Sequence, residues 1–253
     1  VFGGAGVKHD MKIILGQEAY FNPGEKGETL TKARRDAGEN AYNHMIVLAK
    51  NDTGLKNLYE MSADAWKADF YQKPRITLDV LDKYKEGLIV TAACVGGVVG
   101  RAIMNDDIDT ARDWAIKFKD IMGDDFYGEI HDGDDLIKPG YTKTMLDIMD
   151  ALDIPTIITS DCHYANKDDL WLEESMLILN TNPKKNPDAD IKKAASMELL
   201  ERFNYLYPDR KMSFDKVQVY LSSAEEKRAN ILKYKIERED VFENTIKVAE
   251  KIG

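Results

Sequence analysis

The spacing of apolar and polar residues changes repeatedly along the chain, and these changes predict short strands that alternate with helices. Apolar runs rich in β-branched residues and bounded by turn-forming residues predict strands. The strands are expected at residues 11–15, 44–49, 87–93, 125–130 and 156–159. Apolar residues at helical spacing predict the helices. These are expected at 53–65, after 77, and at 107–122, 142–152, 168–179, 196–206, after 223 and 239–252.

Three helix boundaries carry recognisable signals. Thr53 is expected to cap the helix that runs towards Ala65. The amphipathic segment 107–122 is followed by Gly123, which is expected to end its helix. The segment 223–226, Ser-Ala-Glu-Glu, fits a capping box that opens another helix.

The order of these elements predicts the fold class. Strands and helices alternate through short connections, and this pattern favours an α/β fold with a parallel sheet or a barrel. A chain of 253 residues can bury a substantial core, as one α/β domain or two smaller domains.

Side chains that can bind metals follow four of the predicted strands. They are Glu18, Cys94, His131 and the pair Asp161 and His163. Residues two apart on an extended chain point to the same side, so the last two can face one point. Taken singly, each residue more often caps a helix, fills the core or lies on the surface. Because active sites of α/β barrels gather at the carboxyl ends of strands, their recurrence predicts a metal centre.

Two further features lie near these positions. His44 opens the second predicted strand, and by itself a histidine in that place is more often a packed or surface residue than a ligand. The pair Gly96-Gly97 follows Cys94 and would let the backbone turn tightly beside a ligand.

Composition and charge limit the classes of function. The chain is 43% hydrophobic and 32% charged, which is ordinary for a soluble globular protein. No apolar run approaches the roughly 20 residues of a membrane span, and the start lacks the features of a signal peptide. Two cysteines predict a reducing, cytoplasmic environment. The net charge of −10 disfavours binding of nucleic acid by bulk electrostatics, although a metal cluster can bind a phosphate locally.

Six blocks of the sequence, in this order, resemble a known family. They are Gly16-Gln17-Glu18-Ala19-Tyr20, His44-Met45-Ile46-Val47-Leu48-Ala49-Lys50-Asn51, Thr91-Ala92-Ala93-Cys94-Val95-Gly96-Gly97, Thr159-Ser160-Asp161-Cys162-His163-Tyr164, Tyr220-Leu221-Ser222-Ser223-Ala224-Glu225-Glu226 and Glu243-Asn244-Thr245. Together they resemble the polymerase-and-histidinol-phosphatase (PHP) domain of bacterial DNA polymerase III alpha subunits. The resemblance covers nearly the whole chain, and the second and third blocks point to the polymerase branch.

The resemblance implies a distorted, TIM-like (β/α)7 barrel, incomplete at its N-terminus, with up to three Zn²⁺ or Mn²⁺ ions at one mouth. The implied metal ligands are Glu18, which bridges metals in the family, His44, Cys94, Asp161 and His163. Among them, Glu18, Asp161 and His163 are the implied catalytic residues. His131 matches no ligand position of the family, and we expect it at most to support a ligand.

The function implied for the parent protein is DNA-directed DNA synthesis in replication. Its partners would be DNA, deoxynucleoside triphosphates with Mg²⁺ at a separate palm site, a proofreading exonuclease and a sliding clamp. The PHP site would act as a metal-dependent 3′–5′ exonuclease. The alternatives are a stand-alone phosphoesterase of the histidinol-phosphatase type and a non-catalytic PHP scaffold.

The resemblance also predicts the division of the chain. Residues 1–179 are expected to form the partial barrel, 180–219 an inserted or extended connection, and 220–253 the helical end that leads towards the palm. The family's His-x-His motif is expected before Val1, and the palm after Gly253. The chain is therefore expected to be a piece of a larger bacterial or phage protein.

Overall fold

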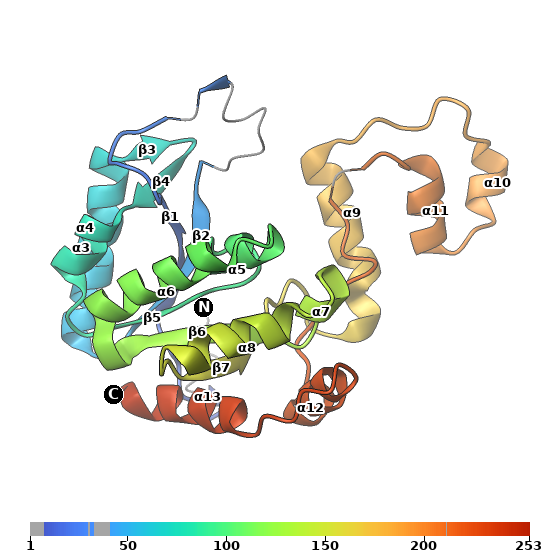
Figure 1. Cartoon of the computed structure of the whole chain (residues 1–253). Helices are drawn as coiled ribbons and strands as arrows, with labels where there is room; N and C mark the ends of the chain where they lie inside the picture. The colour runs from blue at the N-terminus through green and yellow to red at the C-terminus, as the bar shows by residue number, and fades with distance from the viewer. Residues whose placement is uncertain (1–7, 30, 33–40, 211) are drawn as a thin grey trace. The chain divides into compact units, whose positions relative to one another are not determined.

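The chain forms two compact units, seen in a computed structural model that describes residues 8–29, 31–32, 41–210 and 212–253 (Figure 1). Unit 1 comprises residues 1–130, 140–158 and 238–253, and unit 2 comprises 131–139 and 159–237. The predicted boundaries at residues 179 and 219 follow the family resemblance rather than the spatial grouping of residues, and they stay a prediction.

The described residues contain a mixed sheet of seven strands in the order β3-β4-β1-β2-β5-β6-β7. The strands are β1 Gly16–Phe21, β2 Asn43–Ala49, β3 Phe70–Tyr71, β4 Lys73–Ile76, β5 Leu88–Thr91, β6 Phe126–His131 and β7 Thr156–Thr159. β2 runs antiparallel to both β1 and β5, whereas β1 with β4 and β5 with β6 are parallel. The fold is therefore α/β as predicted, and the sheet is mixed because β2 is reversed.

Helices account for most of the remaining chain. In unit 1 they are α3 Asp52–Ala68, α4 Leu78–Tyr84, α5 Val98–Met104, α6 Ile108–Met122, α8 Tyr141–Ala151 and α13 Asp240–Lys251. In unit 2 they are α7 Asp134–Ile137, α9 Leu170–Thr181, α10 Ile191–Ala195, α11 Leu199–Leu206 and α12 Ala224–Leu232. Short 3-10 turns occupy Gly123–Asp125 and Lys167–Asp169. No helix among the described residues combines the length and apolar character needed to cross a membrane.

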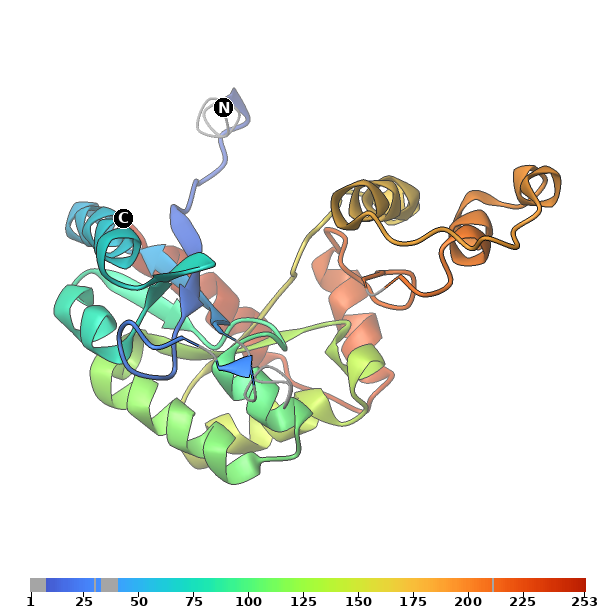
Figure 2. The ribbon, with the colours of Figure 1, turned by 90° about the horizontal axis from the view of Figure 1, so that it is seen from above.

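Helices cover both faces of the sheet in unit 1 (Figures 1 and 2). Every residue of β6 is buried. The ring of Phe126 lies 5.3 Å from that of Phe118 on α6. The next residue, Tyr127, points to the opposite face, since side chains alternate along a strand. There it packs in a cluster with Ile89, Ile157, Val248 and Ile252, of which the last two come from α13 and its end. Burial on both faces explains the nearly continuous apolar sequence of the central strands.

The first strand lies further along the chain than its apolar pattern predicts. Residues 11–15 are outside any strand, and β1 occupies Gly16–Phe21. Met11 is 65% exposed, whereas Ala19 and Phe21 are buried. Pairing with β2 decides the position, because it sets Ala19 opposite Met45 and so buries two apolar side chains on one face.

The helix boundaries confirm two of the predicted signals and correct one. Ser223 and Glu226 form the capping box of α12, and Gly123 follows α6 with a positive φ of 57°. The cap of α3 is Asn51, whose side chain accepts a hydrogen bond from the backbone N–H of Gly54 at 3.0 Å. Thr53 lies inside the first turn of α3, so the prediction that it caps the helix is wrong.

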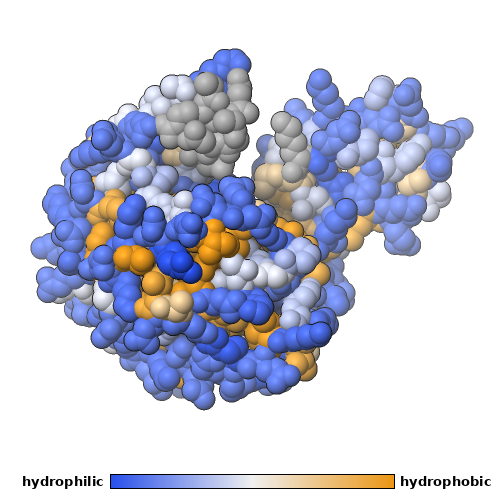
Figure 3. Space-filling model, in the orientation of Figure 1, coloured by the Kyte–Doolittle hydropathy of each residue, from blue (hydrophilic) through white to orange (hydrophobic). Residues whose placement is uncertain are grey.

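The surface is mainly polar, as Figure 3 shows for one face, where hydrophilic residues surround separate apolar patches. In unit 2, helix α9 departs from this rule. Trp171, Leu172 and Met176 are 46%, 49% and 47% exposed, whereas the acidic residue Glu174 is fully buried. The apolar pattern of α9 therefore does not mark the side that packs inwards.

Candidate metal centre

The reversed direction of β2 brings the start of that strand beside the carboxyl ends of its neighbours. In the antiparallel ladder of β1 and β2, Tyr20 lies opposite His44. On the other side of β2, the segment after β5 returns alongside His44, which forms a bridge with Gly97. The backbone N–H of His44 donates to the carbonyl of Gly96 at 3.0 Å. A histidine that opens its strand thus lies among residues that follow or end theirs.

Glu18 reaches His44 from within β1. It was expected beyond the end of the first strand, and the structure corrects this because β1 begins at Gly16. Glu18 lies two residues before Tyr20, so the two side chains point to the same face of the sheet. Because Tyr20 lies opposite His44, Glu18 is the diagonal neighbour of His44 on that face. Ala19, which alternates with them, points into the core.

Glu18 and Cys94 both approach the same nitrogen of His44. The distance from Nδ1 is 2.8 Å to Oε1 of Glu18 and 3.4 Å to Sγ of Cys94. The side chains of His44 and Glu18 are 31% and 47% exposed, so ions in solution can reach them. Carboxylate, imidazole and thiolate are the donors that zinc takes from proteins. We call Glu18, His44 and Cys94 the unit 1 cluster.

Gly96 packs closely against two of these donors, His44 and Cys94. A Cβ atom at this position would lie 3.1 Å from Nδ1 of His44 and 3.3 Å from Sγ of Cys94. The N–H of Gly96 also points to the Cys94 sulfur, at 3.3 Å. Both distances are tighter than ordinary van der Waals contacts, so a side chain at this position would press on the imidazole and the sulfur, and glycine avoids this.

Arg101, on α5, adds a positive charge to this region. Its Nε donates to the carbonyl of Gly96 at 3.0 Å. Burial lowers the pKa of Arg101, and the nearby Cys94 and Tyr42 act in the opposite direction. An arginine keeps its charge at neutral pH even so. The side chain therefore fixes the turn after Cys94 and offers a cation to an anionic ligand.

In unit 2, Asp161 and His163 follow β7 and lie side by side. Oδ1 of Asp161 is 3.5 Å from Nε2 of His163. The other ring nitrogen, Nδ1, is 3.5 Å from Oε1 of Glu173 on α9. The hydrogen bond that His163 donates to Asp161 raises the pKa of His163, burial opposes this change, and the negative charges of Asp161 and Glu173 add to the rise. We call these three residues the unit 2 cluster.

Glu173 is absent from the residues that the sequence motifs single out. The residue lies ten positions after His163 and on a different element, so no short motif joins them. The one available signal was the acidic pair Glu173-Glu174 inside an otherwise apolar helical segment.

His131 is buried and has its own acidic neighbour. Its Nδ1 lies 3.5 Å from Oδ1 of Asp134, and its backbone N–H donates to Oδ2 of the same residue at 2.8 Å. A role for His131 in supporting a metal ligand stays a prediction.

The donor atoms of the unit 1 cluster are of the types that bind a divalent ion, but the distances between them are not those of a bound ion. Among the residues that the structure describes, no three His, Cys, Asp or Glu side chains are arranged to hold an ion as they stand. Two donors with bonds of about 2.1 Å to one ion lie roughly 3.0–3.4 Å apart. The Glu18–His44 contact of 2.8 Å is shorter, because the two side chains bond to each other. The donor types of the unit 1 cluster therefore suit a divalent ion, whereas Glu18 and His44 are spaced for a direct contact with each other.

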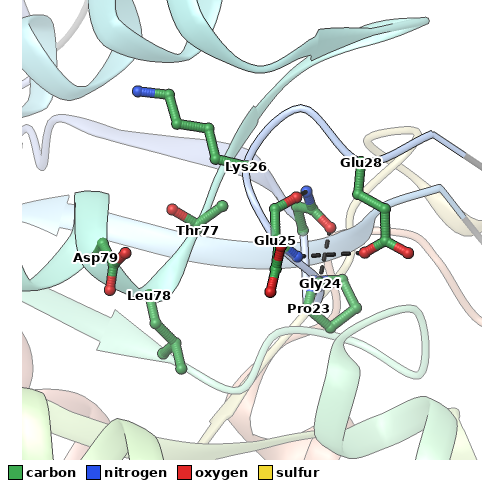
Figure 4. Close-up of a pocket in the computed structure, with 9 residues that line it drawn as sticks. Pro23, Gly24, Glu25, Lys26, Glu28, Thr77, Leu78 and Asp79 are labelled. Atoms are coloured by element: carbon green, nitrogen blue, oxygen red, sulfur yellow. Dashed lines mark hydrogen bonds between the residues drawn. The ribbon is translucent and has the colours of Figure 1, made fainter.

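A large pocket of unit 1 lies elsewhere (Figure 4). Its volume is about 960 Å³, and two short segments line it, 22–28 and 77–79. Among the described residues of its lining, Glu25, Glu28 and Asp79 contribute carboxylates and Lys26 a cation. The pocket contains none of the three residues of the unit 1 cluster among this lining.

Comparison with known proteins identifies the family of the chain. The model of the PHP domain family matches residues 2–133, more than half of the chain, and the chain belongs to that family. PHP domains generally bind divalent metals. The matched range includes the whole unit 1 cluster.

The relatives that resemble the chain are named DNA polymerase III subunit alpha. The protein of Aquifex aeolicus is 38% identical over 170 residues, which are 67% of this chain and 15% of that protein. The protein of Borreliella burgdorferi is 33% identical over 185 residues, 73% of this chain and 16% of that protein. The protein of Mycobacterium tuberculosis is 30% identical over 190 residues, 71% of this chain and 16% of that protein. The chain thus spans a small part of the length of these relatives.

Proposed function

We propose that the chain is the PHP domain of the catalytic alpha subunit of a replicative DNA polymerase III, and that it binds Zn²⁺ or Mn²⁺ to hydrolyse phosphodiester bonds of DNA in the 3′–5′ direction. The observation that carries the metal-dependent part is the convergence of Glu18 and Cys94 on Nδ1 of His44, next to the closely packed Gly96. The names of the relatives support the polymerase part.

Five side chains are proposed to hold the metals. They are Glu18, His44 and Cys94 of unit 1, and Asp161 and His163 of unit 2. A bound divalent ion would supply a more acidic water molecule and would stabilise negative charge on the phosphate. Of these residues, Glu18, Asp161 and His163 are proposed as catalytic. Arg101 would attract the phosphate group locally, which matters in a chain whose net charge is −10.

For the parent protein we propose DNA synthesis during replication in the cytoplasm. Its substrates would be DNA and deoxynucleoside triphosphates, with Mg²⁺ at a palm site, and its partners a proofreading exonuclease and a sliding clamp. These proposals rest on similarity to the relatives alone.

A second candidate is a PHP scaffold without catalytic activity. The observation in its favour is that no three ligand-type side chains among the described residues already surround a common point. This candidate requires that neither Zn²⁺ nor Mn²⁺ produces hydrolysis.

The test measures metal binding and DNA cleavage on the 253-residue chain. Binding of Zn²⁺ and of Mn²⁺ is followed by calorimetry, and hydrolysis with a 3′-labelled single-stranded oligonucleotide. C94A should lose most of the binding, and C162A, which changes the exposed cysteine, should retain it. D161A/H163A should abolish binding and cleavage with the fold intact.

Each candidate predicts a distinct result. Unchanged metal content in C94A and D161A/H163A would refute the proposed centre. Metal binding without cleavage of any phosphate ester would support the scaffold. Hydrolysis of p-nitrophenyl phosphate but not of the oligonucleotide would favour a phosphomonoesterase of the histidinol-phosphatase type.

A further inference from the structure

The ring of His163 has a carboxylate at each of its two nitrogens, and the two carboxylates differ in origin. Asp161 belongs to the same extended segment and faces Nε2, whereas Glu173 belongs to α9 and faces Nδ1, each at 3.5 Å. We propose that Glu173 is a positioning residue, which accepts the Nδ1 proton of His163 and so directs Nε2 to the metal. This inference rests on the proposed metal-binding function of His163 and deepens it.

The surroundings of Glu173 suit a fixed hydrogen-bond acceptor. Its side chain is 17% exposed, compared with 39% for Asp161, so it is the more enclosed of the two carboxylates. Glu173 also lies in the first turn of α9, where the helix dipole stabilises a negative charge. The more enclosed carboxylate is thus the one that faces Nδ1.

The face of the His163 ring packs against Phe214, which is in turn bonded to α9. The ring of Phe214 lies 4.4 Å from that of His163 at an angle of 46°. The backbone N–H of Phe214 donates to Oε1 of Glu174 at 2.6 Å, and Glu174 is fully buried. Two neighbouring residues of α9 therefore act on one imidazole, Glu173 at its edge and Glu174 through Phe214 at its face.

The backbone of His163 is fixed as well. Its N–H donates to the carbonyl of Val219 at 2.7 Å. With the backbone, one face and the Nδ1 edge of the ring held, Nε2 is the nitrogen that faces Asp161, the other proposed ligand. This is the arrangement that metal-binding histidines commonly adopt, with the other N–H on a carboxylate that fixes the tautomer and raises the basicity of the ligand.

The spacing on the Nε2 side agrees with this assignment. Nε2 and Oδ1 of Asp161 are 3.5 Å apart. Two donors in tetrahedral contact with one ion, at bonds of about 2.1 Å, lie roughly 3.4 Å apart. Asp161 and Nε2 therefore face a common ligand position, whereas Glu173 lies at the opposite nitrogen. On this proposal Glu173, which lies outside the six sequence blocks, supports the ligand His163.

The experiment compares E173A, E173Q and D168A in the 253-residue chain. Asp168 is an exposed acidic residue close to the start of α9, and its replacement is the matched control. Calorimetric titration with Zn²⁺ should show about 10–100-fold weaker binding in E173A. E173Q keeps an acceptor oxygen and should recover part of the affinity, and D168A should bind like the wild type.

A spectroscopic measurement separates positioning from a general structural effect. In the Zn²⁺-loaded protein, nitrogen-15 NMR should show the proton of His163 on Nδ1, with the assignment made by H163Q. E173A should lose this exchange-protected proton signal while its circular dichroism stays unchanged. A proton on Nε2 in the wild type, or wild-type Zn²⁺ affinity in E173A, would overturn the inference.

The two proposals can fail separately. If D161A abolishes Zn²⁺ binding and E173A does not weaken it, the metal centre stands and the role of Glu173 is wrong. If D161A also binds Zn²⁺ like the wild type, the proposed centre itself fails, and the inference fails with it.

Discussion

Replacement of Glu174 by glutamine tests whether a buried carboxylate holds unit 2 together. The side chain is fully buried on α9. It accepts hydrogen bonds from Nη2 of Arg210 at 2.8 Å, from the hydroxyl of Ser213 at 3.1 Å and from the N–H of Phe214 at 2.6 Å. The substitution keeps the size of the side chain, removes its charge and replaces one acceptor oxygen with a donor. We expect E174Q to destabilise the packing of α9 against Arg210, Ser213 and Phe214.

The expected magnitude follows from the burial of the pair. The side chain of Arg210 is 5% exposed, so loss of the carboxylate leaves a guanidinium that water barely reaches. Breaking a buried ion pair at one partner costs about 3–5 kcal/mol. Asp215, at 3.9 Å from Arg210, can replace part of the lost charge. We therefore expect a cost of about 3 kcal/mol.

Hydrogen exchange measured by mass spectrometry is the suitable assay, because it reports the opening of one segment. A cost of about 3 kcal/mol corresponds to exchange that is roughly 100-fold faster in the amides of α9. E201Q changes an exposed glutamate of α11 and should leave that exchange within about 0.5 kcal/mol of the wild type.

A double substitution provides the decisive comparison. Replacement of a buried ion pair by apolar residues is often neutral, so E174L/R210L should cost about 2 kcal/mol less than the sum of its single variants. If E174Q exchanges like the wild type, or if the two single costs simply add, the ion pair does not stabilise unit 2 and the reasoning is wrong.

Three further predictions concern unit 1. N51A should lower the free energy of unfolding by about 1 kcal/mol, and T53A by less than about 0.5 kcal/mol, because Asn51 caps α3; urea denaturation measures both. G96A should weaken Zn²⁺ binding about tenfold in a calorimetric titration, since its Cβ would enter the space between the donors of the unit 1 cluster. Hydrogen bonds from Arg238 lower the pKa of Asp240 from its ordinary value of 3.8. That carboxylate therefore stabilises the fold above pH 3.8, and the stabilisation is lost as the pH falls through the lowered value. R238M should cost less than about 1 kcal/mol at neutral pH, since the pair is partly exposed, and the difference from the wild type should shrink below pH 3.8 in acid denaturation curves.

Each of these has a result that contradicts it. Equal losses of unfolding free energy in N51A and T53A would mean that Asn51 and Thr53 contribute equally to capping α3. Unchanged Zn²⁺ affinity in G96A would place the ion away from the unit 1 cluster. A difference between R238M and the wild type that persists at pH 2 would assign the stabilisation to packing of the arginine rather than to charge.

Local patterns in the sequence were sufficient for the elements that depend on neighbouring residues. The strand Thr156–Thr159 has the predicted bounds, α6 ends at Gly123, and the capping box of α12 begins at Ser223. These features depend on β-branched runs, caps and left-handed turns, whose energies are set within a few residues along the chain.

The position of β1 and the direction of β2 needed the whole fold. Residues 11–15 are as apolar as a strand, yet β1 begins at Gly16, because pairing with β2 buries Ala19 and Phe21. The antiparallel course of β2 could not be read from alternation of strands and helices, which predicts parallel neighbours. That reversal explains why His44, at the start of its strand, lies beside Cys94.

The sequence alone determined which side chains could bind a metal, since donor chemistry is a property of the residue. From its residue types and its resemblance to the PHP family, it predicted the donors of the unit 1 cluster and the pair Asp161 and His163, and these ligands stay a prediction. Only the tertiary structure decided which atoms meet: two donors on Nδ1 of His44, and Glu173 on Nδ1 of His163. The physical reason is that ligand chemistry is local, whereas distances between residues on different strands and helices depend on register and packing, which the whole chain sets together.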